Sequence, residues 1–297
     1  MGETLLYDVV QVGYGPVSQV LALMLVRDGH RVAAELVRHT IYTFRSLVAE
    51  DWRRGRVLLA GDAAHTMPPF MGQGMCAGIR DAWNLRWKLD AVLRGEASDA
   101  LLDSYTVERK PHVSAVIDAA VYLGRIICIA DPAEAAARDR AFRDGTAEKP
   151  PLFPHLTAGL LAAGGAGLMA GLLAPHDEVE FRGRTGRWDD VVGLGFCVVL
   201  RDADPASVLR ADQMTALTSL GAHVVGVAEG PMRGLVVDGA GRYTGFLETH
   251  GAIGMVTRPD FYIFGGVTEP EHLVGLVDEL LGTLAANGMA VRIAQHA

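Results

Sequence analysis

Apolar and polar positions over the first 35 residues follow the order strand, turn, helix and strand. An apolar run at residues 7–13 predicts a short buried strand, and apolar residues at helical spacing follow over residues 17–28. The run Arg31-Val32-Ala33-Ala34 predicts the start of another short strand. This order is typical of the opening of a βαβ unit, in which two parallel strands flank a crossover helix.

The middle of the chain is predicted to be mostly helical. A short strand is expected over residues 56–60, and wide apolar coverage predicts a long helix over residues 74–94. Residues 101–130 are expected to form one or two further helices, with a break at Pro111, because proline cannot donate the helical hydrogen bond.

Two segments then separate this region from the C-terminal part. The charged residues 134–149 and the prolines that follow them predict a linker. Residues 156–174 are apolar and uncharged, so their length alone would allow them to cross a bilayer. Most of their apolar residues are alanine and glycine, which favours a pliable interdomain connection, and no membrane association is expected.

Beyond residue 188 the pattern changes to short runs typical of a mixed α/β domain. The expected strands and strand pieces cover residues 191–200, 222–227, 233–238 and 245–246, with a hairpin over 254–258 and 261–264. Helices are expected over residues 211–220 and 272–287.

The composition of the chain argues against nucleic acid as a partner and against sites built from cysteine. The chain has 297 residues, 27 Lys and Arg against 35 Asp and Glu, and no basic run, so nucleic acid is an unexpected partner. Its three cysteines, Cys76, Cys128 and Cys197, are far apart and form no CxxC motif. This argues against a disulfide framework, a cysteine-rich zinc site and a dithiol redox motif, and it predicts a reducing, cytoplasmic setting.

The first candidate site is the glycine turn Gly13-Tyr14-Gly15-Pro16, which follows a predicted strand and opens a predicted helix. In that context, small residues let backbone N–H groups approach a pyrophosphate at the helix N-terminus. Glu35 lies about 20 residues beyond Gly15, the offset at which an acidic residue binds ribose hydroxyls. An exposed glutamate at a chain junction explains Glu35 equally well.

The second candidate site begins where the strand over residues 56–60 ends. Asp62 could accept hydrogen bonds from a polyol, and Gly72-Gln73-Gly74 would present free backbone N–H groups at the start of a long helix. His65 could act as a general base or a metal ligand. No second ligand is suitably spaced, so a packed histidine is favoured, with no metal site and no assigned catalytic residue.

Residues 56–93 resemble the FAD-dependent aromatic hydroxylases, the class A flavoprotein monooxygenases. The likeness rests on Gly-Asp-Ala-Ala-His at 61–65 and on the run Gly-Gln-Gly-Met-Cys-Ala-Gly-Ile-Arg-Asp-Ala-Trp-Asn-Leu-Arg-Trp-Lys-Leu at 72–89. It continues through Tyr105, Glu108 and Arg109, and it is closest to the 3-(3-hydroxyphenyl)propionate hydroxylase type. Many members carry Asn where Cys76 stands.

The resemblance implies FAD as the cofactor, NAD(P)H as a transient electron donor, and O₂ and a small phenolic molecule as substrates. It places Asp62 at the flavin ribityl chain, Pro68 and Pro69 at the flavin and substrate face, and Gly72 to Gly74 near the flavin pyrimidine edge. The residues predicted to bind the cofactor are Gly13, Gly15, Pro16, Glu35, Gly61, Asp62, Pro69, Gly72, Gln73 and Gly74.

The tail is similar to the thioredoxin-like C-terminal domain of that family, through Gly195-Phe196 and residues 256–262. Because CxxC is absent, a structural or dimerising role is favoured, and a homodimer stays open. The predicted fold is therefore α/β: an abbreviated Rossmann-like FAD-binding domain over 1–145, a linker over 146–176 and a thioredoxin-like domain over 177–297.

One departure from the family separates the candidate functions. Only about 50 residues lie between Gly13 and Asp62, where the family has most of its flavin domain and its substrate-binding sheet. About 200 residues, a full domain, are missing near residues 33–35. The chain is therefore either a reduced monooxygenase that still binds FAD, or a catalytically impaired remnant that binds flavin or serves as a dimerising scaffold. A third alternative is an unstable product of internal loss.

Overall fold

A computed structural model describes residues 9–12, 26, 32–35, 43–164 and 167–291. The chain divides into two compact units, residues 1–44 and 45–297. In the smaller unit, β1 (Val9–Val12) and β2 (Val32–Glu35) pair in parallel, with Val9 opposite Val32. This confirms the two strands of the predicted βαβ opening. The helix predicted over residues 17–28 lies outside the described residues, except for Val26, which is helical.

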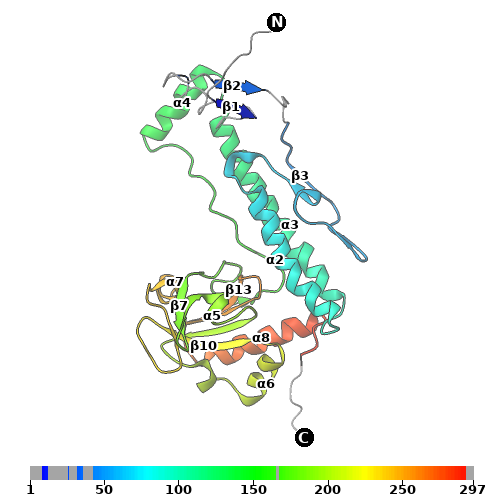
Figure 1. Cartoon of the computed structure of the whole chain (residues 1–297), viewed down its shortest axis with the longest axis vertical. Helices are drawn as coiled ribbons and strands as arrows, with labels where there is room; N and C mark the ends of the chain where they lie inside the picture. Colours follow the sequence, from blue (N-terminus) through cyan, green and yellow to red (C-terminus); the bar gives the residue numbers. More distant parts are fainter. Residues whose placement is uncertain (1–8, 13–25, 27–31, 36–42, 165–166, 292–297) are drawn as a thin grey trace. The chain divides into compact units, whose positions relative to one another are not determined.

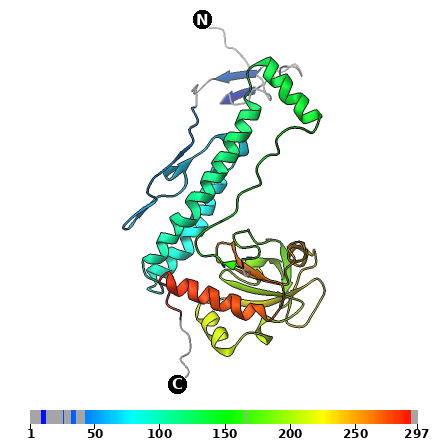
Figure 2. The same ribbon diagram turned by 180° about the vertical axis from the view of Figure 1, so that it is seen from behind.

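The larger unit begins with short strands and turns, which lead into two long helices. The short elements are β3 (Leu47–Val48), β4 (Arg53–Arg54), β5 (Val57–Leu58), η1 (Gly61–Ala63), β6 (His65–Thr66) and η2 (Pro69–Met71). The helices α2 (Gly74–Leu93) and α3 (Ala100–Ile127) lie side by side (Figures 1 and 2). The predicted helix over 74–94 is confirmed, whereas the predicted strand over 56–60 is reduced to the two residues of β5.

The break expected at Pro111 is wrong, because α3 continues through it. Pro111 is exposed, while His112 and Val113 beside it are buried. A proline inside a helix costs about 3 kcal/mol. The apolar face on both sides of Pro111, which includes Tyr105 and Val116, is fully buried and offsets that cost.

The charged segment predicted as a linker contains a helix, α4 (Pro132–Arg143). The Asp131 side chain caps it by accepting hydrogen bonds from the backbone N–H groups of Ala133 (2.8 Å) and Glu134 (2.9 Å). Asp at the N-cap followed by Pro is a recognised helix start, so this signal was present in the sequence. The domain boundaries at residues 145 and 176 remain predictions.

The C-terminal part is a seven-stranded mixed sheet in the order β13-β12-β9-β10-β11-β7-β8. Its strands are β7 (Glu178–Phe181), β8 (Arg184–Arg187), β9 (Cys197–Arg201), β10 (His223–Ala228), β11 (Val236–Val237), β12 (Gly254–Thr257) and β13 (Ile263–Val267). Strand β10 pairs in parallel with β9 and β11, and the other pairs are antiparallel. The strand expected over 222–227 and the 254–264 hairpin are confirmed. The strand expected over 191–200 is wrong in its first half, because Val191 ends a short helix and β9 begins at Cys197, and the strand expected over 233–238 is reduced to β11. The β7–β8 hairpin was not predicted.

Helices cover both faces of this sheet (Figures 1 and 2). They are α5 (Trp188–Val191), α6 (Ala211–Ser219), α7 (Arg242–Thr249) and α8 (His272–Ala286), with the short turn η4 (Pro205–Ser207). Val198 packs in the core with α6 and α8, whereas Val199 packs in the core with α5 and α7. The strand piece predicted at 245–246 is wrong, because both residues lie inside α7.

The connection over residues 156–174 is part of the folded sheet. Ala162 N–H donates to Phe264 O (2.8 Å), and Gly171 N–H donates to Ile263 O (2.9 Å). Ile263 N–H in turn donates to Leu172 O (2.8 Å). The segment therefore covers the outer edge of β13, which would otherwise expose unpaired backbone groups.

In the described ranges, no single helix is long and apolar enough to cross a bilayer. The pair Ala100–Ile127 and Pro132–Arg143 passes that test only when taken together, and it is bent by 112° at its break.

A loop of the C-terminal sheet joins it to α2 and α3. We call residues 258–262, which connect β12 to β13, the docking loop; Arg258 N–H donates to Tyr262 O (2.8 Å) and closes it. The Arg258 guanidinium donates to both carboxylate oxygens of Glu108 on α3 (2.9 and 2.7 Å) and to Asp260 (2.7 Å). Because these side chains are almost completely buried, the ion pairs fix the loop against the helices.

Helix α2 completes this ionic cluster. Lys88 donates to Glu108 (2.7 Å), and the Asn84 amide bridges Glu108 (2.7 Å) and Asp260 (2.8 Å). Burial lowers the pKa of Lys88 to about 8, although Glu108 opposes the shift. Burial by itself raises the pKa of Glu108, but Arg258 and Lys88 hold it well below its usual range. Glu108 is therefore the shared counter-ion of two buried cations.

Replacing that counter-ion should destabilise the larger unit. Glu108→Gln leaves Lys88 buried without its carboxylate and leaves Arg258 with Asp260 alone, so we expect a loss of about 3–5 kcal/mol in the free energy of unfolding. Urea unfolding measures it, with Asp118→Asn on an exposed position of the same helix as the control. Equal stability of the two variants would contradict this account of the junction.

Candidate functional site

The Gly61–Asp62 turn lies against the first half of α2. Gly61 opens η1 with a backbone φ of +56°, in the left-handed region that favours glycine. A Cβ placed on Gly78 of α2 would lie 3.4 Å from Gly61 Cα, so the turn and the helix approach closely. Gly78 is one helical turn beyond Gly74, and the structure therefore brings two predicted cofactor segments to the same end of α2.

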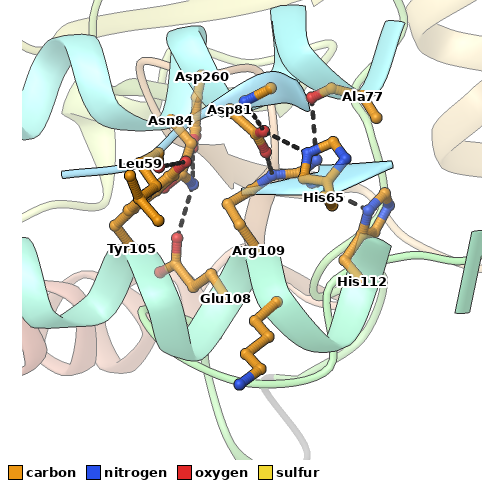
Figure 3. A network of polar contacts seen from close by, with 12 residues as sticks. Leu59, His65, Ala77, Asp81, Asn84, Tyr105, Glu108, Arg109, His112 and Asp260 are labelled. Carbon is orange, nitrogen blue, oxygen red and sulfur yellow. Dashed lines mark hydrogen bonds and ion pairs between the residues drawn. The ribbon is translucent and has the colours of Figure 1, made fainter. Parts of the chain in front are cut away.

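Asp81, which is fully buried on α2, holds this turn in place (Figure 3). One carboxylate oxygen, Oδ2, accepts hydrogen bonds from Gly61 N–H (3.0 Å) and from His65 Nε2 (2.7 Å). The other, Oδ1, accepts from Arg109 Nε (2.9 Å) on α3. Burial raises the pKa of Asp81, but His65 and Arg109 outweigh it and hold that pKa below its ordinary value. The carboxylate is thus ionised, and both of its oxygens accept hydrogen bonds.

His65 is a packed side chain, as the sequence favoured. It is 2% exposed, and its ring stacks on Trp52 with the centroids 5.4 Å apart. Its Nδ1 atom is buried and has no hydrogen-bond partner among the described residues, whereas Nε2 lies 2.7 Å from the Asp81 carboxylate, so Nε2 carries the proton that is donated to Asp81. Within the described part of the chain, no group of three or more His, Cys, Asp or Glu residues is placed to hold a metal ion.

Arg109 links this turn to the rest of the larger unit. Its Nη1 atom donates to His112 Nδ1 (2.9 Å) and to the hydroxyl of Tyr262 in the docking loop (3.3 Å). His112 Nε2 donates to Pro154 O (3.2 Å). Burial and the positive charge of Arg109 lower the pKa of His112 to about 3, so the ring is neutral and can accept from Arg109.

Asp62 differs from these buried groups. It is the central residue of η1 and is exposed, and its carboxylate makes no hydrogen bond or ion pair with the described residues. The backbone beneath it is fixed on both sides, because Tyr105 donates to Leu59 O (2.9 Å) and Ala49 N–H donates to Ala64 O (2.8 Å). An unpaired carboxylate on a fixed turn can accept hydrogen bonds from a hydroxylated ligand.

The segment before α2 leaves backbone donors available. The N–H groups of the first turn of a helix have no intrahelical partner, and within the described residues the N-cap side chain does not accept from them. Gln73 occupies the N-cap position, and its Oε1 accepts from Arg80 (3.2 Å). Gly72, with φ of +61°, ends η2 and turns the chain into the helix.

Pro69 is the exposed first residue of η2. Its neighbour Phe70 fixes that turn on α3, because a Cβ at Gly124 would lie 2.3 Å from the Phe70 ring. The pair of turns that flank the start of α2 is therefore anchored to both long helices.

The remaining predicted site residues belong to the smaller unit. Gly13, Gly15 and Pro16 lie outside the described residues, so the pyrophosphate turn stays a prediction. Glu35 is the last residue of β2, and its contact with ribose also stays a prediction.

Sequence reasoning missed Asp81 and Tyr262 as supports of the site, and it used Arg109 only as a point of resemblance. The sequence does contain a sign of these supports, because Asp81, Asn84 and Lys88 recur at helical spacing among the apolar residues of α2 and are buried with them. Residues of these types are seldom fully buried unless they are paired, so each required a partner.

Comparisons with known proteins agree with the resemblance. Residues 28–120 match the FAD binding domain family, and residues 171–283 match the HcaD C-terminal domain family. A probable NADH-specific resorcinol 4-hydroxylase of Rhodococcus jostii is 41% identical over 85% of this chain and 47% of its own length. A 3-(3-hydroxy-phenyl)propionate/3-hydroxycinnamic acid hydroxylase of Mycobacterium avium is 34% identical over 91% of this chain and 51% of its own length.

Among solved structures, the flavin-dependent monooxygenase PieE, in complex with FAD and substrate, aligns with a TM-score of 0.61. It is 22% identical, and the match covers 82% of this chain and 50% of PieE, which shows a shared fold. The chain spans about half the length of the curated relatives it matches, in keeping with the expected missing segment. Along most of its length the chain is thus similar to resorcinol and 3-(3-hydroxy-phenyl)propionate hydroxylases, with a match to the FAD binding domain family followed by a match to the HcaD C-terminal domain family.

Proposed function

We propose that this chain binds FAD and, with NAD(P)H and O₂, hydroxylates a small phenolic molecule. The observation that carries the proposal is the exposed Asp62, which has no partner among the described residues and stands on a turn that buried Asp81 fixes beside the start of α2. The relatives named as resorcinol and hydroxyphenylpropionate hydroxylases supply the substrate class.

The residues present fit the flavin in two ways. Asp62 would accept hydrogen bonds from the ribityl hydroxyls, because its carboxylate is solvent-facing and has no partner among the described residues. The free N–H groups at the start of α2, from Gly74 onward, would face the electron-rich pyrimidine edge, where the helix dipole favours negative charge. Pro69 and Gly72 shape the turn between the two.

When bound, FAD would supply the redox chemistry that couples oxidation of NAD(P)H to reduction of O₂, with one oxygen atom going to the phenol ring and the other leaving as water. In this proposal Asp81 keeps the Gly61–Asp62 turn in its binding geometry and takes no part in proton transfer, since its oxygens are already occupied. The chain's own contribution is therefore to bind, orient and electrostatically stabilise the flavin.

A second candidate is a flavin-binding remnant that does not hydroxylate. It is favoured by the small number of residues between Gly13 and Asp62, about 50, which is too few to form the family's substrate-binding sheet. Exclusion of water protects reactive intermediates, so a chain without that sheet would lose reducing equivalents to peroxide. A homodimer and a cytoplasmic location remain predictions from the sequence.

Removal of the Asp62 carboxylate tests its contact with the flavin. Asp62→Ala should raise the Kd for FAD by about 10- to 150-fold, because a hydrogen bond to a charged group contributes about 1.5–3 kcal/mol. Titration of flavin fluorescence measures the Kd. Asp90→Ala, at an exposed position farther along α2, is the matched control and should leave it unchanged. If both variants bind FAD as the unmodified chain does, Asp62 does not hold the ribityl chain.

The ratio of hydrogen peroxide formed to NADH consumed separates hydroxylation from uncoupled oxidation. With FAD, NADH and either resorcinol or 3-(3-hydroxyphenyl)propionate, we expect less hydrogen peroxide than NADH consumed. Mass spectrometry should show a product heavier by one oxygen atom. Peroxide equal to NADH with both phenols, and no oxygenated product, would favour the remnant.

A further inference from the structure

We propose that the docking loop positions the Gly61–Asp62 turn through Arg109 and Asp81, so that the C-terminal domain helps to set the affinity for FAD. The effect on FAD rests on the proposed function; the positioning itself does not. The domain resembles a redox module but carries no CxxC motif, and this connection gives it a role at the cofactor turn.

A continuous path of hydrogen bonds carries the inference (Figure 3 shows its centre). Arg109 Nη1 donates to the Tyr262 hydroxyl (3.3 Å), and Arg109 Nε donates to Asp81 Oδ1 (2.9 Å). Asp81 Oδ2 then accepts from Gly61 N–H (3.0 Å). The path runs from Tyr262 in the docking loop, through Arg109 on α3 and Asp81 on α2, to the backbone N–H of Gly61, the residue before Asp62.

The side chains of this path are buried, so the loss of one hydrogen bond affects the next. Asp81 and Arg109 are 0% exposed and Tyr262 is 2% exposed, so bulk water cannot readily replace a lost partner. The guanidinium is planar and presents its donors in fixed directions. A shift at one edge of Arg109 therefore changes the angle at which its Nε meets Asp81, whose other oxygen is held by Gly61 and His65.

The docking loop is a firm support for this path, because other residues anchor it. Arg258 and Asp260 fix it to Glu108 and Asn84, next to Arg109 on α3 and Asp81 on α2. Within the loop, Phe261 adopts a left-handed φ of +65°, and its N–H donates to Arg258 O (3.0 Å). Removing the Tyr262 hydroxyl should therefore leave the loop docked and interrupt only its contact with Arg109.

The test compares Tyr262→Phe with Tyr122→Phe. Tyr122 also lies in the larger unit and also makes a hydroxyl hydrogen bond, in which it donates to Glu148 O (3.0 Å), but it is off the path. Two quantities are measured for each variant: the hydrogen-exchange rate of the Gly61 amide, and the Kd for FAD. A single hydrogen bond contributes about 0.5–1.5 kcal/mol, so Tyr262→Phe should raise both by about 2- to 12-fold. Tyr122→Phe should change neither.

Asp81→Asn is the stronger variant, and it should raise Gly61 exchange further, because it removes the charge that holds Arg109. Since the path passes through Asp81, adding Tyr262→Phe to Asp81→Asn should have little further effect on Gly61 exchange. A role in general stability alone would speed exchange at buried amides throughout the larger unit together with Gly61, whereas the positioning role raises exchange at Gly61 selectively.

The outcomes separate the two proposals. If the unmodified chain binds no FAD but Gly61 exchange responds to Tyr262→Phe, the proposed function fails and the positioning role stands. If FAD binds, and Tyr262→Phe leaves Gly61 exchange and the FAD Kd at the values of Tyr122→Phe, the positioning role is overturned and the proposed function stands.

Discussion

The structure of the larger unit depends on buried charge at the contact between α2, α3 and the docking loop. Asp81 and Glu108 are completely buried carboxylates, and each would be very costly without a cation and several donors. Arg109 satisfies the first, and Arg258 with Lys88 satisfies the second. Because these partners come from three segments of the chain, their pairing specifies how the helices and the C-terminal sheet meet.

The candidate site follows from this arrangement. Once Arg109 has fixed Asp81, the remaining carboxylate oxygen can hold both Gly61 N–H and His65, which defines the turn. Gly61 and Gly78 allow that turn to lie close to the helix. Asp62 then stands exposed beside backbone donors, on a support that does not need to move when a ligand binds. Such preorganisation lowers the entropic cost of binding.

The sequence predicted elements well wherever one local pattern decided them. Apolar periodicity located α2 and α8, and the glycine-bounded apolar runs located the hairpin β12–β13. It failed at Pro111 because buried contacts on both sides of a solvent-facing proline outweighed a local rule. It also missed α4, whose Asp131 cap was visible, because charge was interpreted as a linker.

The support beneath the site was harder to predict, for a physical reason. Arg258 lies 150 positions from Glu108 in the sequence, and Tyr262 lies 153 from Arg109, so no local pattern reports either contact. The most direct measurement for the whole account is the flavin content of the purified, folded protein. We predict visible absorbance at the flavin bands, with FAD bound in a near-stoichiometric ratio after reconstitution. A protein that is folded by circular dichroism but remains colourless after addition of FAD would contradict the account.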